Sequence, residues 1–351
     1  MDTETGLGLA PGPESLWIGT LLDGVGAGVG TDRPRATSVR LDVPPGDDAA
    51  AFVVPEGSRL VVSSDASVEG IHFRREWMTW EIVGYRAAAS ALSDLAAMAA
   101  EPIGLTLSLA LPPELDANAV SAIGRGVGEA LRYTGGTILG GDLVASPGPV
   151  MLDVTVLGHT PRPVTRSGAG VGEEVWITGS LGGAAAAVAD LQAGLEPTPE
   201  ARAAFEHPRP RVAEALWLAE RVEPTALIDV SDGLGRDGRH LATSSSVRLD
   251  VALEDLPAHP SLEPYLESDA GVRLLLAGGE DYELLFTAPP GRVTPVLAEF
   301  STRFGIDLTR IGFTSHGRSL RVTREDDGGG EADVGGETDT DGFDHFGEAT
   351  S

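Results

Sequence analysis

Glycine-rich turns at the ends of short apolar runs are the feature that most constrains how this chain folds. Glycine accounts for 46 of the 351 residues, and the glycines gather where strand-like or helix-like segments stop. An α/β protein places its turns and ligand loops at such positions. We therefore expect an α/β fold whose functional residues lie beside these glycines.

The order of the segments predicts two α/β domains. Apolar residues recur at helical spacing over 79–100, and the turn-rich stretch 161–168 is typical of a linker. Domain 1–160 is expected to contain strands at 49–54, 59–64, 103–111 and 150–157 and helices at 14–23, 79–100 and 116–133. Domain 161–351 is expected to contain a second series of helices and strands and an acidic loop at 325–341.

The charge balance excludes several classes of function. The chain has 53 acidic and 25 basic residues and a net charge of −28, so it repels nucleic acids and anionic lipids. Every basic residue is Arg, which excludes a lysine phosphate clamp and a Schiff base, and the lack of Cys excludes thiolate chemistry. Strong acidity without Lys favours a salt-rich, halophile-like cytoplasm.

The N-terminus lacks the pattern of a signal peptide, and no apolar run approaches the roughly 20 residues of a membrane span. These features predict a cytoplasmic protein without a membrane partner.

Short acidic motifs are the candidates for chemistry. Each is predicted to place a carboxylate at a strand end or within an apolar helix. Taken singly, each also fits a structural role as a surface turn, a strand exit or a helix N-cap. Asp94 is harder to explain in that way, because an ionised carboxylate on an apolar helix face is costly unless it is paired or metal-bound. The motifs are Gly-Asp-Asp at 46–48, Ser-Ser-Asp at 63–65, Ser-Asp at 93–94, Gly-Gly-Asp at 140–142 and Asp-Val-Ser-Asp-Gly at 229–233.

Convergence of these carboxylates would make a magnesium site. Mg²⁺ prefers oxygen ligands, retains several waters and bridges side chains to substrate phosphates. Gly140 and Gly141 are expected to let backbone N–H groups approach a phosphate, with Asp142 on the metal.

Three further segments have two interpretations each, and a fourth has one. Arg166 is either a phosphate ligand or a solvated linker residue, and His72 either contacts substrate or packs beside Ile71 and Phe73. The acid-rich stretch 278–284 indicates either an exposed sheet edge or a cationic ligand. The aromatic end of the acidic tail, at 343–346, is predicted to dock back onto the body of the protein.

The order of the motifs resembles that of the thiamine-monophosphate kinase family, from about residue 12 to 347. The motifs that carry the resemblance are Gly-Asp-Asp-Ala-Ala (46–50), Ser-Ser-Asp (63–65), Glu-Gly-Ile-His-Phe (69–73), Leu-Ser-Asp-Leu-Ala-Ala-Met (92–98), Gly-Gly-Asp (140–142), Thr-Arg-Ser-Gly-Ala (165–169), Asp-Val-Ser-Asp-Gly-Leu (229–234), Gly-Gly-Glu-Asp-Tyr-Glu-Leu (278–284) and Gly-Phe-Asp-His-Phe (342–346).

The resemblance implies a phosphotransferase with a phosphate group as acceptor. ATP would donate its γ-phosphoryl directly, with several Mg²⁺ ions, to thiamine monophosphate in an in-line transfer. It also implies the fold of aminoimidazole-ribonucleotide synthetase, in which an N-terminal α/β domain binds ATP and magnesium and forms a homodimer. A second α/β domain follows, whose C-terminal segment returns to the substrate site.

The resemblance also assigns roles to residues of this sequence. Asp94, Asp142 and Asp232 would be catalytic. Metal ligands would be Asp48, Ser63, Ser64, Asp65, Asp94, Asp142, Asp229 and Asp232; ATP ligands Gly141, Asp142, Arg166 and Ser231; and thiamine monophosphate ligands His72, Glu280 and Phe343. Two alternatives remain open at this point: another ATP-using member of the superfamily, such as aminoimidazole-ribonucleotide synthetase itself, and a non-catalytic acidic module that binds magnesium or nucleotides.

Overall fold

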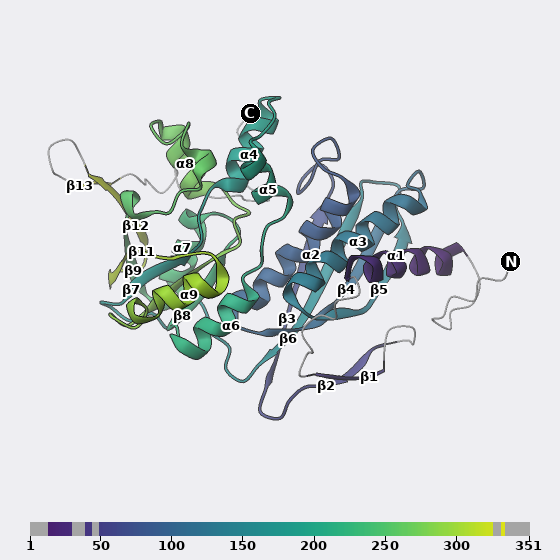
Figure 1. Cartoon of the computed structure of the whole chain (residues 1–351), viewed down its shortest axis with the longest axis horizontal. Coiled ribbons are helices and arrows are strands. Elements are labelled where there is room, and N and C mark those ends of the chain that lie inside the picture. Colours follow the sequence, from purple (N-terminus) through teal and green to yellow (C-terminus); the bar gives the residue numbers. More distant parts are fainter. Residues whose placement is uncertain (1–12, 30–38, 44–48, 326–330, 334–351) are drawn as a thin grey trace. The chain divides into compact units, whose positions relative to one another are not determined.

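A computed structural model describes residues 13–29, 39–43, 49–325 and 331–333 (Figure 1). The chain divides into two units, Met1–Pro163 and Val164–Ser351, and the division falls within the turn-rich stretch 161–168. Each unit has its own sheet and its own helices.

Unit 1 is built on a four-stranded sheet of order β3-β6-β4-β5. Strands β4 and β5 are parallel, and the chain between them forms helix α3, as a parallel connection requires; the other pairings are antiparallel. A separate hairpin precedes this sheet. The strands are β1 (Arg40–Val43), β2 (Ala51–Val53), β3 (Arg59–Val68), β4 (Glu101–Leu111), β5 (Thr137–Ala145) and β6 (Met151–Thr160).

Helices α1 (Pro13–Val29), α2 (Trp80–Ala97) and α3 (Ala117–Thr134) form one layer in unit 1. Thr79 and Asp116 begin α2 and α3 as N-caps, each accepting a backbone N–H with its side chain. The helices approach closely at two glycines. A Cβ on Gly84 would lie 2.1 Å from the carbonyl oxygen of Ile123, and one on Gly126 would lie 1.9 Å from that of Glu81. No larger residue fits either position without moving a helix.

The four-stranded sheet has one covered and one open face. Side chains that alternate onto the covered face, such as Leu105, Leu107 and Val154, are buried beneath the helices. On the opposite face, Leu60 and Val62 of β3 remain 53% and 63% exposed. The open face therefore carries large apolar side chains that remain exposed on β3.

Strands β7, β10 and β8 lie together at one end of the seven-stranded sheet that the described strands of unit 2 form, and every residue of the three is buried. All pairings are antiparallel except that of β12 with β9. The sheet order is β13-β12-β9-β11-β7-β10-β8, with strands β7 (Glu174–Thr178), β8 (Ala226–Val230), β9 (Val247–Ala252), β10 (Glu283–Ala288), β11 (Leu308–His316), β12 (Leu320–Glu325) and β13 (Glu331–Asp333).

The helices of unit 2 include two that bear on the candidate site. Helix α7 (Leu234–Ser245) follows β8 directly, and α4 (Gly183–Gln192) follows β7. The others are α5 (Pro199–Glu206), α6 (Val212–Arg221), α8 (Asp269–Ala277) and α9 (Leu297–Phe304), with short 3₁₀ turns at Leu253–Asp255, Pro260–Leu262 and Thr294–Val296. None of the helices that the structure describes is long and apolar enough to cross a bilayer.

Most predicted elements are present, with four differences. Strand β1 and helix α5 were not predicted. Gly-Gly-Asp at 140–142 lies inside strand β5, so Asp142 is not at a strand end and the two glycines do not form a loop. Asp65 likewise lies inside β3 rather than at its exit. The predicted acidic loop 325–341 contains a short strand, β13, paired with β12.

Candidate active site

Two predicted metal ligands of unit 1 meet directly. Ser63 on β3 donates its hydroxyl to Oδ2 of Asp94 on α2, at 2.5 Å. Ser63 and Asp65 are two residues apart on a strand, so both point to the face that α2 covers. Asp94 therefore has a hydrogen-bond donor that offsets part of the cost of placing a carboxylate on an apolar helix.

Ser64 points to the opposite, open face of the same sheet. Its hydroxyl lies 2.9 Å from that of Thr155 and donates to Oδ1 of Asp153 at 3.2 Å. Ser63 and Ser64 therefore do not reach the same ion through their side chains. The structure divides this predicted group of ligands between the two faces.

Asp142 belongs with Ser64 rather than with Asp94. It pairs in register with Ser108, which in turn pairs with Asp153, and residues opposite one another across a ladder share a face. Its own Oδ1 accepts the backbone N–H of Leu143 at 2.9 Å. Asp142 is thus an exposed carboxylate on the open face of the sheet.

His72 lies in the turn after β3 and is half-buried. Its Nδ1 accepts the backbone N–H of Val68 at 3.1 Å, while the adjacent Phe73 is buried against Trp80 in an edge-on contact. In this hydrogen bond Nδ1 is the acceptor nitrogen of the ring.

In unit 2, the loop between β8 and α7 carries Ser231 and Asp232. Asp237, one turn into α7, accepts the backbone N–H groups of both residues with its Oδ2, at 3.0 and 2.9 Å. Arg236 lies 3.6 Å from the Asp232 carboxylate. Asp237 was not among the predicted site residues, although its position five residues after Asp232 at a helix start is a possible signal for a capping acid.

Asp237 is itself buried close to other acids. Burial first, and then repulsion from Asp229 and Asp232, raises the pKa of Asp237 to about 8. Asp229 is 6% exposed at the end of β8. The loop thus concentrates negative charge, which favours a bound cation.

Arg166 lies near the same helix. Its side chain is exposed, and its carbonyl oxygen accepts the hydroxyl of Ser245 at 3.0 Å. Partial burial, with the charges of Arg166 and Arg236, lowers the pKa of His240. Guanidinium groups therefore lie near α7, and a guanidinium is a common phosphate ligand.

The Gly-Gly-Glu-Asp-Tyr-Glu-Leu motif forms a turn against the loop that carries Ser231. The N–H of Glu280 donates to the carbonyl oxygen of Ser231, and that of Tyr282 to the carbonyl oxygen of Val230, both at 2.8 Å. A Cβ on Gly279 would lie 2.4 Å from the Ser231 oxygen, so only glycine allows this contact. Glu280 is half-buried.

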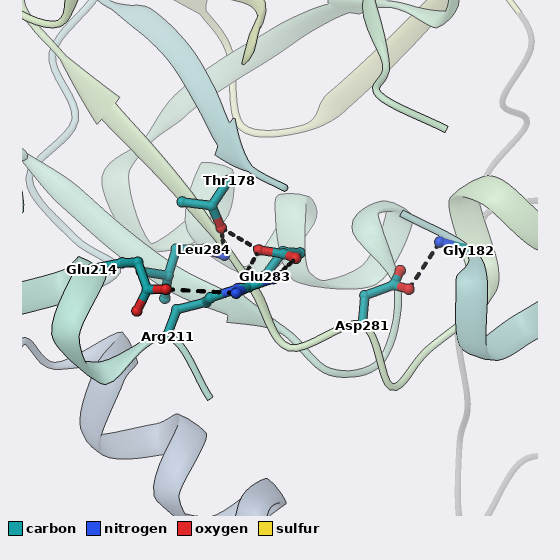
Figure 2. A network of polar contacts seen from close by, with 7 residues as sticks. All are labelled: Thr178, Gly182, Arg211, Glu214, Asp281, Glu283 and Leu284. Atoms are coloured by element: carbon teal, nitrogen blue, oxygen red, sulfur yellow. Dashed lines mark hydrogen bonds and ion pairs between the residues drawn. The ribbon is translucent and has the colours of Figure 1, made fainter. Parts of the chain in front are cut away.

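Glu283, the last acid of this motif, is buried in an interior strand, so the prediction of an exposed sheet edge is wrong. Strand β10 lies between β7 and β8. Arg211 donates to both oxygens of Glu283, at 2.8 and 2.5 Å, and Thr178 donates to Oε2 at 2.5 Å (Figure 2). A protein cation therefore neutralises Glu283. The sequence signal was available, because an acid in an interior strand requires a buried partner.

The predicted ligands supply carboxylate and hydroxyl oxygens alone, which suits Mg²⁺, and Ser63 and Asp94 are close enough to share an ion. Across the described ranges, however, no group of three or more His, Asp or Glu side chains is arranged to hold a metal ion. The donor set fits an ion that keeps waters and substrate phosphates as its other ligands. The predicted ligands Asp48 and Phe343 lie outside the described residues.

The chain is similar over most of its length to a curated relative. The thiamine-monophosphate kinase of Salmonella typhimurium is 35% identical over 263 residues, which are 74% of this chain and 80% of the relative. The chain belongs to the thiamine-monophosphate kinase family. The family resemblance inferred from the motifs is confirmed. The prediction that the chain is an enzyme of this class is confirmed as well.

Solved structures confirm the α/β fold of the family. The crystal structure of thiamine-monophosphate kinase from Stenotrophomonas maltophilia has a TM-score of 0.75 at 32% identity, covering 86% of this chain and 95% of that one. AaThiL complexed with AMPPCP and TMP has a TM-score of 0.69 at 30% identity, covering 77% of this chain and 85% of that one. The family model of the AIR synthase related protein N-terminal domain matches residues 46–160.

Proposed function

We propose that the chain transfers the γ-phosphoryl group of ATP to the phosphate of thiamine monophosphate, giving thiamine diphosphate and ADP. The observation that carries the proposal is membership of the kinase family, together with a relative that binds AMPPCP and TMP. AMPPCP is an analogue of ATP, so the relative's two ligands represent donor and acceptor. The acceptor is already an anion, so positioning and charge neutralisation matter more than a strong general base.

Ser63, Asp65 and Asp94 of unit 1 would hold Mg²⁺, and so would Asp229 and Asp232 of unit 2. When bound, magnesium would neutralise the phosphate charges and help to align an in-line transfer. Ser64 and Asp142 lie on the open face of the sheet and would therefore serve a different ion from Asp94. More than one ion per chain is consistent with this division.

The substrate roles follow the chemistry of each side chain. Arg166 and Ser231 would bind the nucleotide phosphates, as would the backbone at Gly141. The thiazolium ring of thiamine is cationic, so its pocket needs a carboxylate and aromatic faces. Glu280 and Phe343 would supply these, with His72 as a polar contact.

We also propose that the chain forms a homodimer through the open face of the four-stranded sheet. Leu60, Val62, Val144 and Met151 are large apolar residues exposed on strands of this sheet, and their burial is favourable. Two chains of charge −28 repel each other, so the dimer should form best at high salt.

The experiment that tests the reaction is incubation of the purified protein with ATP, Mg²⁺ and thiamine monophosphate in high salt, with chromatographic detection of thiamine diphosphate. We expect diphosphate only when all three are present. Asp94→Asn should lower the rate by about a hundredfold or more, because the amide lacks the charge that holds the metal.

Asp116→Asn is the matched control, because Asn caps α3 as well as Asp does. It makes the same chemical change in the same unit and should leave the rate unchanged. Absence of diphosphate from the wild-type protein, or a normal rate for Asp94→Asn, would contradict the proposal. ATP binding without turnover would instead indicate a nucleotide-binding module.

A further inference from the structure

The turn that carries Glu280 is held in an unusual conformation. Glu280 and Tyr282, on either side of Asp281, have φ angles of 70° and 53°. Residues other than glycine rarely adopt positive φ, and such strain persists only where surrounding contacts impose it. The contacts that impose it here should therefore control where the Glu280 side chain points.

Asp281 makes the contact on one side of the turn. Its Oδ1 accepts the backbone N–H of Gly182 at 2.8 Å (Figure 2). Gly182 is the N-cap of helix α4, so the carboxyl satisfies an N–H group that has no partner within the helix. Its Oδ2 is buried and has no hydrogen-bond partner among the described residues.

The Ser231 loop makes the contact on the other side. The N–H of Glu280 donates to the carbonyl oxygen of Ser231, and the N–H of Tyr282 donates to that of Val230. These are backbone contacts and do not depend on the Asp281 side chain. Removing that side chain would release the turn from α4 while leaving the Ser231 loop in place.

We propose that Asp281 is a positioning residue for the acceptor substrate, because its carboxyl fastens the Glu280 turn to the start of α4 and so orients Glu280 toward thiamine monophosphate. The inference rests on the proposed function, in which Glu280 binds that substrate. Burial raises the pKa of Asp281 well above its usual range, which agrees with a group that acts by hydrogen bonding rather than by charge.

The test compares Asp281→Ala, Asp281→Asn and Asp190→Ala. Asn keeps an oxygen that accepts the Gly182 N–H but carries no charge. Asp190 lies on the same helix α4, where its Oδ1 accepts the hydroxyl of Tyr265 at 2.5 Å, so its replacement is a control for loosening the helix. The measurements are KM for each substrate, the Kd of thiamine monophosphate by calorimetry, and the melting temperature.

We expect Asp281→Ala to raise KM and Kd for thiamine monophosphate by about tenfold or more while KM for ATP changes by less than about threefold. Asp281→Asn should remain close to wild type, and Asp190→Ala should lower the melting temperature without changing either KM. Should Asp281→Ala not fold, Asp281→Ser carries the same expectation.

Three results would overturn the inference: unchanged thiamine monophosphate binding in Asp281→Ala, equal loss of affinity for both substrates, or a loss in Asp281→Asn as large as in Asp281→Ala. The last result would mean that the charge of Asp281 attracts the thiazolium cation. If the wild-type protein bound no thiamine monophosphate, the proposed function would fail and the inference with it.

Discussion

One face of the four-stranded sheet of unit 1 carries mainly exposed and half-buried side chains, whereas strands β7, β8 and β10 of unit 2 are buried along their full length. Polar groups follow this difference. On the open face, Ser64, Asp153 and Thr155 bond to one another within reach of water. In the buried strands, Glu283 is fully paired by Arg211 and Thr178.

This comparison shows where the chain keeps acids available and where it uses them for structure. A buried charge without a partner costs several kcal/mol, so Glu283, the acid of β10, is tied to Arg211 and Thr178. Acids beside an open face carry no such penalty and can serve ligands or metals. Four predictions test the comparison.

The largest effect is expected from Arg211→Ala. It leaves Glu283 and Glu214 buried without their cation and should lower the free energy of unfolding by about 3–5 kcal/mol. Arg221→Ala, at the other end of α6, breaks an exposed pair with Glu299 and should cost less than about 1 kcal/mol. Denaturant titration measures both, and similar losses would contradict the contrast between buried and exposed pairs.

Val62→Asp tests the open face. A carboxylate at this 63% exposed position should weaken the proposed dimer by at least about tenfold, or roughly 1.4 kcal/mol. Light scattering at high salt should show a dimer for the wild type and a monomer for the variant. Val171→Asp, at a 50% exposed valine in unit 2, is the control. A wild-type monomer, or a Val62→Asp dimer, would rule out this interface.

Thr178→Val and Thr155→Val make the same change in the two settings. Thr178 donates to Glu283 and accepts the N–H of Leu284 at 2.8 Å, so its loss should cost about 1–3 kcal/mol. Thr155→Val should stay within about 0.5 kcal/mol, since water replaces its partners. Measuring both in the Val62→Asp background removes any contribution from the dimer. Equal costs would mean that burial does not decide the outcome.

The smallest effect is a change in pH dependence. Burial raises the pKa of Glu214, although the opposing charge of Arg211 limits the rise. An acidic group whose pKa is higher in the folded state than in the unfolded state stabilises the fold at pH values below its unfolded-state pKa. This contribution is lost as the pH rises through the folded-state pKa. Glu214→Gln removes the titration, so its stability relative to wild type should increase from pH 5 to pH 8.

Denaturant titration at the two pH values checks this sign, with the exposed Glu299→Gln as the control. If the stability of Glu214→Gln relative to wild type fell from pH 5 to pH 8, the effect of the Arg211 charge on the pKa of Glu214 would outweigh that of burial.

The sequence by itself determined the alternation of helices and strands and the family of the chain. Periodicity and turn residues located α2, β4 and α3 closely, because these are local signals that each segment carries within itself. The order of the motifs indicated the family, because a set of short patterns in fixed order rarely arises by accident.

Only the tertiary structure decided which acids are available. Residues 278–284 are equally compatible with an exposed edge and an interior strand until the position of β10 is known. Asp94 and Asp142 both look like metal ligands in the sequence. Strand register places Asp142 on the open face, whereas the packing of α2 on the sheet places Asp94 beside Ser63. Arg211 lies 72 residues from Glu283, and no local pattern pairs them. Charge depends on burial and on partners distant in sequence, which folding alone brings together.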